Sequence, residues 1–199
     1  MNSKEPLAFR MRPKTLEEYV GQEHVLGKDK ILYRTIKADR LSSIILFGPP
    51  GCGKTSLARV ISETTKYKFY KINAVTSGVA EIKKVIEETR NFMLNPTGKS
   101  ILFIDEIHRF NKLQQDALLP YVENGTIILI GATTENPYFE VNKALISRSM
   151  VIKLEPLTTE NVFTILKNAI TRKDGLGEYN IKVEDETLKK LAIIANGDV

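Results

Sequence analysis

The sequence has a single cysteine, Cys52, among 199 residues. One cysteine excludes both an internal disulfide and a zinc site built from several cysteines, and it fits a reducing compartment. Long apolar runs are also missing, since the longest has five residues (191–195), whereas a membrane-spanning helix needs about twenty. The first nine residues contain no apolar stretch of signal-peptide length. We therefore expect a cytoplasmic protein without a membrane-spanning segment.

The overall composition is that of a folded chain with a modest positive charge. Hydrophobic residues make up 42% of the sequence, a share that argues against disorder, and charged residues make up 27%. The formal net charge of +5 is compatible with nucleic-acid binding, but an ordinary solvated surface explains it equally well. The length predicts one sizeable core and a smaller additional unit.

Short apolar runs alternate with helical patterns along most of the chain, which is typical of an α/β fold with a parallel sheet. Several of these runs are almost continuously apolar, as expected for strands buried on both faces. The pattern changes after Pro156, where two helices are expected to follow. The sequence therefore predicts a core over residues 1–157 and the start of a small helical lid over residues 158–199. The five expected strands are residues 43–47, 68–72, 100–104, 126–130 and 150–154.

The expected helices are defined by the spacing of their apolar residues. One stripe follows offsets of three and four residues, namely Val79, Ile82, Ile86, Thr89 and Met93. Asn111 and Gln114 form a capping-box pattern that opens a helix with four side chains turned inward: Leu113, Ala117, Leu118 and Tyr121. Pro120 lies in this second pattern and predicts a kink or an early end. In the lid, Thr158 or Thr159 is expected to cap a helix that ends near residue 172, and a further helix should cover residues 185–195.

The clearest motif matches G-x-x-x-x-G-K-[ST] in full, between an apolar strand and a helical pattern. Such a phosphate loop points backbone N–H groups at phosphate oxygens, at the positive end of the following helix. Lys54 would reach the β- and γ-phosphates of ATP, and the hydroxyl of Thr55 would bind Mg²⁺. Cys52 is interpreted as a small loop residue, with a redox-sensing role as the alternative. The predicted nucleotide-binding residues here are Gly48, Pro49, Pro50, Gly51, Cys52, Gly53, Lys54, Thr55 and Ser56.

A second motif is the apolar run over residues 101–104 that ends in two carboxylates, Asp105 and Glu106. About fifty residues after a phosphate loop, this arrangement indicates that Asp105 holds Mg²⁺ and that Glu106 orients and polarises the attacking water. The adjacent acid favours a hydrolase over a small-molecule kinase, and the sequence shows no acceptor site for a kinase.

Two weaker candidates follow the next strand. Thr133 or Thr134 is placed to touch the γ-phosphate or the water, although threonines are common in loops. Arg148 precedes the last expected strand and is either a surface residue or an arginine finger that reaches the ATP of a neighbouring subunit.

At this point the sequence resembles the AAA+ superfamily. Residues 12–22, with Arg12-Pro13 and Val20-Gly21-Gln22, resemble the segment that closes over adenine in clamp-loader subunits, which implies that Val20 and Gly21 contact the nucleotide. Three longer stretches resemble the replication-associated recombination protein A family, which is related to the Werner-helicase-interacting ATPase. They lie in residues 11–24 (MRP to GQEH), 105–116 (DEIHRFNK with QQD) and 131–137 (GATTENP).

This resemblance implies an ATPase stimulated by single-stranded, gapped or forked DNA that acts at stalled replication forks. It implies that Arg148 acts in trans within a homo-oligomer, that Thr133 is the γ-phosphate sensor, and that replication or repair proteins are partners in a nucleoid-associated location. By similarity to clamp loaders, Asn73 is expected either to hold Glu106 inactive until DNA binds or simply to be a turn residue. A structural hydrogen bond is the expected role of His24 and of His108.

The family also has a lid arginine that follows a Gly-Asp pair, and the sequence ends at Gly197-Asp198-Val199, before that residue. We therefore expect a fragment of a longer, oligomeric protein that binds ATP but hydrolyses it weakly on its own. The alternative function is a nucleotide-gated, clamp-loader-like adaptor whose main role is protein binding.

Overall fold

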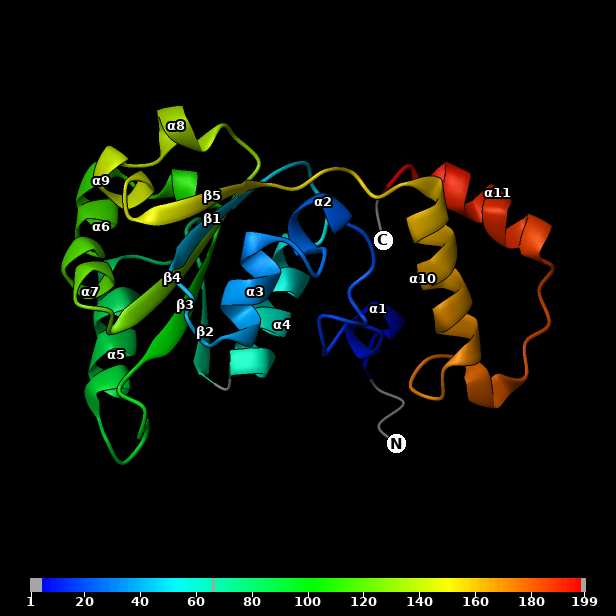
Figure 1. Cartoon of the computed structure of the whole chain (residues 1–199), viewed down its shortest axis with the longest axis horizontal. Helices are drawn as coiled ribbons and strands as arrows, with labels where there is room; N and C mark the ends of the chain where they lie inside the picture. Colours follow the sequence, from blue (N-terminus) through cyan, green and yellow to red (C-terminus); the bar gives the residue numbers. More distant parts are fainter. Residues whose placement is uncertain (1–4, 66, 198–199) are drawn as a thin grey trace.

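The computed structural model describes residues 5–65 and 67–197, so Asp198 of the Gly-Asp pair lies outside the described residues. Its centre is a five-stranded sheet in the order β2-β3-β4-β1-β5, and every pair of neighbouring strands is parallel (Figure 1). This confirms the predicted α/β class and all five predicted strands. The strands are β1 (Ser43–Phe47), β2 (Lys68–Asn73), β3 (Ser100–Asp105), β4 (Ile127–Thr133) and β5 (Ser149–Lys153).

The sheet is buried because helices cover both of its faces, and this explains why its central strands are apolar at consecutive positions. Ile44 and Leu46 of β1 belong to one hydrophobic cluster, whereas Ile45 between them belongs to the other. The first cluster is completed by α3 (Ile31–Lys37) and α4 (Lys54–Thr65), and the second by α5 (Val79–Arg90).

Short helices make the remaining connections around the sheet. The segment before β1 forms α1 (Leu7–Arg10) and α2 (Glu23–Leu26). The 3₁₀ turn η1 (Ile107–Arg109), α6 (Lys112–Asp116) and α7 (Leu119–Glu123) connect β3 to β4, and α8 (Pro137–Glu140) and α9 (Lys143–Ile146) connect β4 to β5.

Three of the sequence expectations for this part of the fold need correction. Met93 lies beyond the end of α5 and is 94% exposed, so it does not continue the apolar stripe. Leu113 is 78% exposed because α6 ends at Asp116, before its pattern can complete a buried face. β4 continues to Thr133, three residues further than expected, because Gly131, Ala132 and Thr133 stay paired with the last three residues of β1.

The predicted helix cap at Asn111 and the predicted helix break near Pro120 are confirmed. Asn111 and Gln114 exchange the two hydrogen bonds of a capping box, at 2.9 and 2.8 Å. The helical pattern around Pro120 is divided into α6 and α7, and the proline lies in the first turn of α7. A proline is tolerated there because the first N–H groups of a helix have no partner within it.

The lid segment lies beside the core and consists of α10 (Thr159–Thr171), the 3₁₀ turn η2 (Gly177–Tyr179) and α11 (Asp185–Ala195), with α1 next to α10 (Figure 1). Thr158 caps α10, since its hydroxyl accepts a hydrogen bond from the N–H of Asn161 at 3.2 Å. The division into two domains near residue 157 stays a prediction. Within the described parts of the chain, no helix combines the length and apolar character needed to cross a membrane.

Candidate active site

The loop over residues 48–53 connects β1 to α4 and depends on glycine at its closest contacts. Gly53 has φ of +94°, and a Cβ on it would collide with the hydroxyl oxygen of Tyr19. A Cβ on Gly48 would collide with the carbonyl oxygen of Leu154. The loop therefore has its tight shape because neighbouring segments approach its backbone directly.

Lys54 is folded back onto this loop. Its ammonium group is buried and donates hydrogen bonds to the carbonyl oxygens of Gly48 and Pro49, each at 2.7 Å. The thiol of Cys52 is completely buried, with Sγ 3.8 Å from the Lys54 nitrogen. The loop thus encloses the ammonium group of Lys54. The two carbonyl oxygens that accept its hydrogen bonds occupy positions that phosphate oxygens can take.

A cavity of about 290 Å³ joins this loop to the end of β3. Parallel strands have their carboxyl ends at the same edge of the sheet, and ligands of α/β proteins bind outside that edge. The cavity brings together most of the predicted phosphate and metal residues. Its lining consists of Pro50, Gly51, Gly53, Lys54, Thr55, Ser56, Asp105, Glu106 and Thr134.

The two acidic residues at this edge have different surroundings. Asp105 ends β3 and forms an ion pair with Lys71 at 3.3 Å. Glu106 has a left-handed backbone (φ 54°, ψ 46°), a conformation that a residue other than glycine adopts at a cost and that is common at functional sites. Its Oε2 lies 3.3 Å from Nδ1 of His108.

Thr133 also contacts His108. Its hydroxyl oxygen lies 2.8 Å from Nδ1 of His108 and accepts a hydrogen bond from the N–H of Glu135 at 3.0 Å. The residue that lines the phosphate cavity is the neighbouring Thr134. Asn73 is paired with Asp105 in the sheet, and its side-chain oxygen accepts a hydrogen bond from the N–H of Val75 at 2.8 Å.

Arg148 lies at the opposite edge of the sheet from the phosphate loop. It precedes β5, whose five residues span about 16 Å and run parallel to β1. Its guanidinium contacts Glu123 at 2.7 Å and the carbonyl oxygen of Ala144 at 2.9 Å, and its side chain is 40% exposed. Arg148 therefore does not reach the phosphate loop of its own chain.

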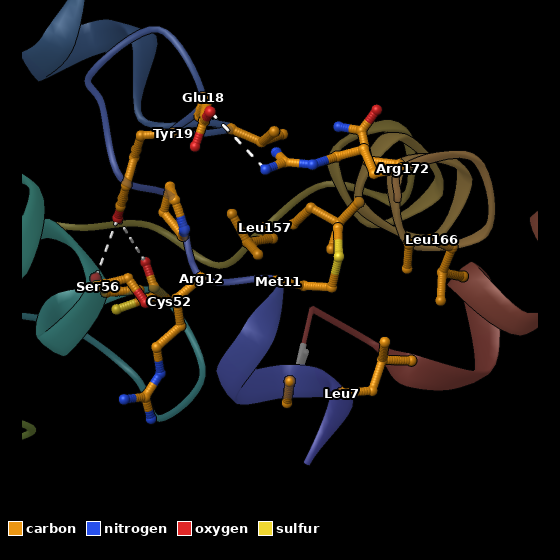
Figure 2. A pocket seen from close by; sticks show the side chains of 17 residues that line it. Leu7, Met11, Arg12, Glu18, Tyr19, Cys52, Ser56, Leu157, Leu166 and Arg172 are labelled. Carbon is orange, nitrogen blue, oxygen red and sulfur yellow. Dashed lines mark hydrogen bonds and ion pairs between the residues drawn. The ribbon is translucent and has the colours of Figure 1, made fainter. Parts of the chain in front are cut away.

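A second cavity of about 240 Å³, shown in Figure 2, lies between the N-terminal segment and α10. It begins at Cys52 and Gly53 of the phosphate loop and at Ser56 of α4, so the two cavities share Gly53 and Ser56. Its walls are mainly apolar, which suits the faces of a purine ring. They include Leu7, Met11, Pro13, Val20, Leu157, Ile165, Leu166 and Ala169.

Gly21 does not line this cavity but fixes the chain next to it. It has φ of +85°, and a Cβ there would lie 2.9 Å from a methyl carbon of Leu157. The N-terminal segment and the connection to α10 therefore meet at Gly21.

Tyr19, which no sequence motif included, and Gln22, whose motif predicted no such contact, tie the N-terminal segment to the phosphate loop. The Tyr19 hydroxyl lies 3.2 Å from the carbonyl oxygen of Gly53 and 3.4 Å from that of Cys52 (Figure 2). Burial raises the pKa of this phenol well above its usual value, so it stays a donor. The Gln22 amide donates to Cys52 and, at 2.7 Å, to the carbonyl of Glu155.

Arg172 closes the far side of the cavity. It makes a two-pronged contact with Asp174, at 2.9 and 2.7 Å, and this contact lowers the pKa of that carboxyl group. The same guanidinium lies 3.8 Å from Glu18 of the N-terminal segment (Figure 2). An ion pair thus bridges the two walls of the cavity.

These residues fit a nucleoside triphosphate with Mg²⁺: an apolar pocket for the base, a glycine-rich loop with a buried ammonium group for the phosphates, and Thr55 with Asp105 for the metal. The fold and the site together define a P-loop nucleotide-binding domain of the AAA+ class. More particularly, residues 11–166 match the family described as the Holliday junction DNA helicase RuvB P-loop domain, and the chain belongs to that family.

Curated relatives support the more specific resemblance found in the motifs. Replication-associated recombination protein A of Escherichia coli (strain K12) is 50% identical over 99% of this chain, which covers 44% of that protein. ATPase WRNIP1 of Dictyostelium discoideum is 49% identical over 97% of the chain, which covers 22% of that protein. The predicted similarity to this group is confirmed, and the chain spans less than half the length of both relatives.

Among solved structures, the Thermotoga maritima RuvB Holliday junction branch migration motor superimposes with a TM-score of 0.76 and 27% sequence identity. The match covers 95% of this chain and 61% of that chain. The likeness therefore includes the sheet, the phosphate loop and the lid helices.

Proposed function

We propose that this chain is the nucleotide-binding part of a DNA-dependent ATPase that acts in replication-fork maintenance and recombination repair and hydrolyses ATP to ADP and phosphate. One observation carries the hydrolytic part of this proposal. Glu106 lines the same cavity as the phosphate loop and Thr55. A carboxylate without a role in metal binding is the group needed to accept a proton from an attacking water.

The residues divide the work between binding and proton transfer. Lys54 would exchange its two loop carbonyls for phosphate oxygens, and Thr55 and Asp105 would hold Mg²⁺. The metal neutralises negative charge on the phosphates when it is bound. Glu106 would orient the water, while Thr133 at the end of β4, or Thr134 that follows it and lines the cavity, would contact the γ-phosphate.

The DNA part of the proposal is supported by the names of the relatives, which refer to recombination and to a Holliday junction motor, and by the net charge of +5. We propose single-stranded, gapped or forked DNA as the activator, replication or repair proteins as partners, and a nucleoid-associated location in the cytoplasm. The distance of Arg148 from its own phosphate loop supports a homo-oligomer in which Arg148 acts on a neighbouring site.

Phosphate release from ATP, measured with and without forked, gapped and duplex DNA, tests both parts of this proposal. We expect hydrolysis that rises with forked or gapped DNA and is abolished in Lys54→Ala. If hydrolysis is the same with and without every DNA, the ATPase proposal stands and the proposed DNA dependence is refuted. If no condition gives hydrolysis, the proposal that the protein is an ATPase is refuted.

The role of Glu106 is tested separately by Glu106→Gln, which keeps the shape of the side chain but removes the proton acceptor. We expect ATP affinity to stay within a few-fold of wild type while turnover falls by about 10²-fold or more. Normal turnover in this variant would refute the assignment of Glu106.

A further inference from the structure

The Glu106–His108–Thr133 cluster contains one buried imidazole between two residues of the proposed hydrolytic site. The side chain of His108 is 8% exposed, and its Nδ1 lies 2.8 Å from the Thr133 hydroxyl and 3.3 Å from Oε2 of Glu106. Two segments 25 residues apart in sequence therefore meet at a single ring nitrogen.

The proton on this nitrogen follows from what its neighbours can do. An ionised carboxylate can only accept hydrogen bonds, so an unprotonated Nδ1 next to Glu106 would bring two lone pairs together. This repulsion assigns the hydrogen to Nδ1, which then donates it to the hydroxyl oxygen of Thr133 at 2.8 Å, while the carboxylate of Glu106 lies 3.3 Å from the same nitrogen.

This arrangement also determines the direction of the Thr133 hydroxyl. Its oxygen already accepts a hydrogen bond from the N–H of Glu135. With Nδ1–H as a second donor, both acceptor positions of the oxygen are filled, and the hydroxyl hydrogen is left to donate to another group.

We propose that His108 is a positioning residue that makes Glu106 and Thr133 act as one unit. Through Nδ1–H it donates to the Thr133 hydroxyl, and it attracts the Glu106 carboxylate, which lies 3.3 Å from the same nitrogen. The ring therefore sets the position of the carboxylate proposed to orient the water relative to the proposed γ-phosphate sensor. A change at one of these residues is then transmitted to the other through the ring. This inference rests on the proposed function, and it adds to it a residue that touches neither phosphate nor metal.

The ring can be replaced without leaving a sealed void. On its other side His108 borders an open cavity of about 570 Å³, together with Phe110, Gln115 and Tyr138. Variants at this position are therefore expected to fold, because the space left by a smaller side chain connects to solvent.

Three substitutions separate the hydrogen bond from the volume of the ring. His108→Ala removes both, and His108→Phe keeps the ring volume without a donor. His108→Asn is smaller but retains an amide N–H at the position of Nδ1. We expect kcat for ATP to fall roughly 10- to 100-fold in the Ala and Phe variants, with KM within about threefold, and to recover in the Asn variant. His24→Ala is the matched control, since the other histidine contacts a backbone carbonyl outside the cluster.

The kinetic result overturns the inference if His108→Phe supports turnover and His108→Asn does not. The volume of the ring, and not its hydrogen-bond donor, would then be the property required. The inference is equally overturned if all three variants turn over like the wild type. Lys54→Ala, which tests only the proposed function, is assayed in parallel.

A second measurement does not depend on activity. Nitrogen-15 NMR of the histidine rings at about pH 8, where an ordinary imidazole is neutral, reports which nitrogen carries the hydrogen. The chain has two histidines, so His24→Ala assigns both. We expect His108 to be protonated at Nδ1, and its signal to shift in Glu106→Gln. Protonation at Nε2 alone would overturn the inference even in an active enzyme, and the measurement remains decisive if no hydrolysis is found.

Discussion

The shape of the phosphate loop depends on the absence of a side chain at Gly53. In Gly53→Ala, the added methyl group would collide with the Tyr19 hydroxyl, and the backbone would keep a φ of +94° that alanine disfavours. We expect the affinity for an ATP analogue to fall by at least about tenfold, measured by titration with a fluorescent nucleotide.

The matched control is Gly125→Ala, at a glycine with φ of +71° and no atom within 4 Å of the added Cβ. It carries a comparable backbone cost without a collision, so it should lower the melting temperature slightly and leave nucleotide affinity unchanged. Equal loss of affinity in both variants would show that general destabilisation, and not contact with Tyr19, explains the effect.

At the residue scale, the sequence predicts those parts of the site whose determinants are consecutive. The phosphate loop is recognisable because its glycines, Lys54 and Thr55 follow one another in a fixed pattern. The contacts of Tyr19, Gln22 and His108 carry no such pattern, since they join positions between 25 and 133 residues apart. Only the folded chain brings these groups together.

At the scale of helices and strands, the sequence predicts best where burial and local signals agree. The limits of β1 and α11 are as expected because apolar runs and polar ends coincide there. The sequence does not predict the extension of β4 because Gly131 and Ala132 are weak strand formers, and pairing with Ile45 and Leu46 of β1 keeps them in the strand. The four-residue helices α8 and α9 are too short to show an apolar period.

The cap of α10 is the element whose loss is easiest to measure. Thr158→Ala removes the side-chain acceptor for the N–H of Asn161, a change that typically costs about 1 kcal/mol. We expect a correspondingly lower free energy of unfolding in urea, and a weaker affinity for ATP because α10 lines the apolar pocket.

Thr164→Ala serves as the comparison for this cap. Thr164 lies on the exposed side of the same helix, where its hydroxyl bonds only to the carbonyl of Glu160. Its removal should change stability by less than that of Thr158. If the two variants were equally stable, the cap would not contribute to the fold.

At the scale of the whole molecule, the position of Arg148 predicts a complementation experiment. Arg148→Ala keeps an intact phosphate loop, and Lys54→Ala keeps an intact Arg148. Each variant alone should lose hydrolysis, and for an arginine finger the rate in Arg148→Ala should fall by about 10³-fold. Mixed subunits should recover hydrolysis, measured as phosphate release, wherever a Lys54→Ala subunit supplies Arg148 to an intact neighbouring site.

The control for this experiment is a mixture of Lys54→Ala with Glu106→Gln. Both changes lie in the same cavity, so no arrangement of these subunits creates an intact site. Recovery in the control mixture, or its absence in the Arg148 mixture, would contradict action between subunits.

The apolar pocket has one further consequence, because its two walls come from distant parts of the chain. Leu7 and Arg172 lie on opposite sides of it, so a nucleotide held between them acts as a removable cross-link around more than 150 residues (Figure 2). Any ligand that binds only the closed arrangement stabilises it by mass action. A nucleotide bound in the proposed way would therefore hold α10 and the N-terminal segment together, and the contact between them would be less stable without it.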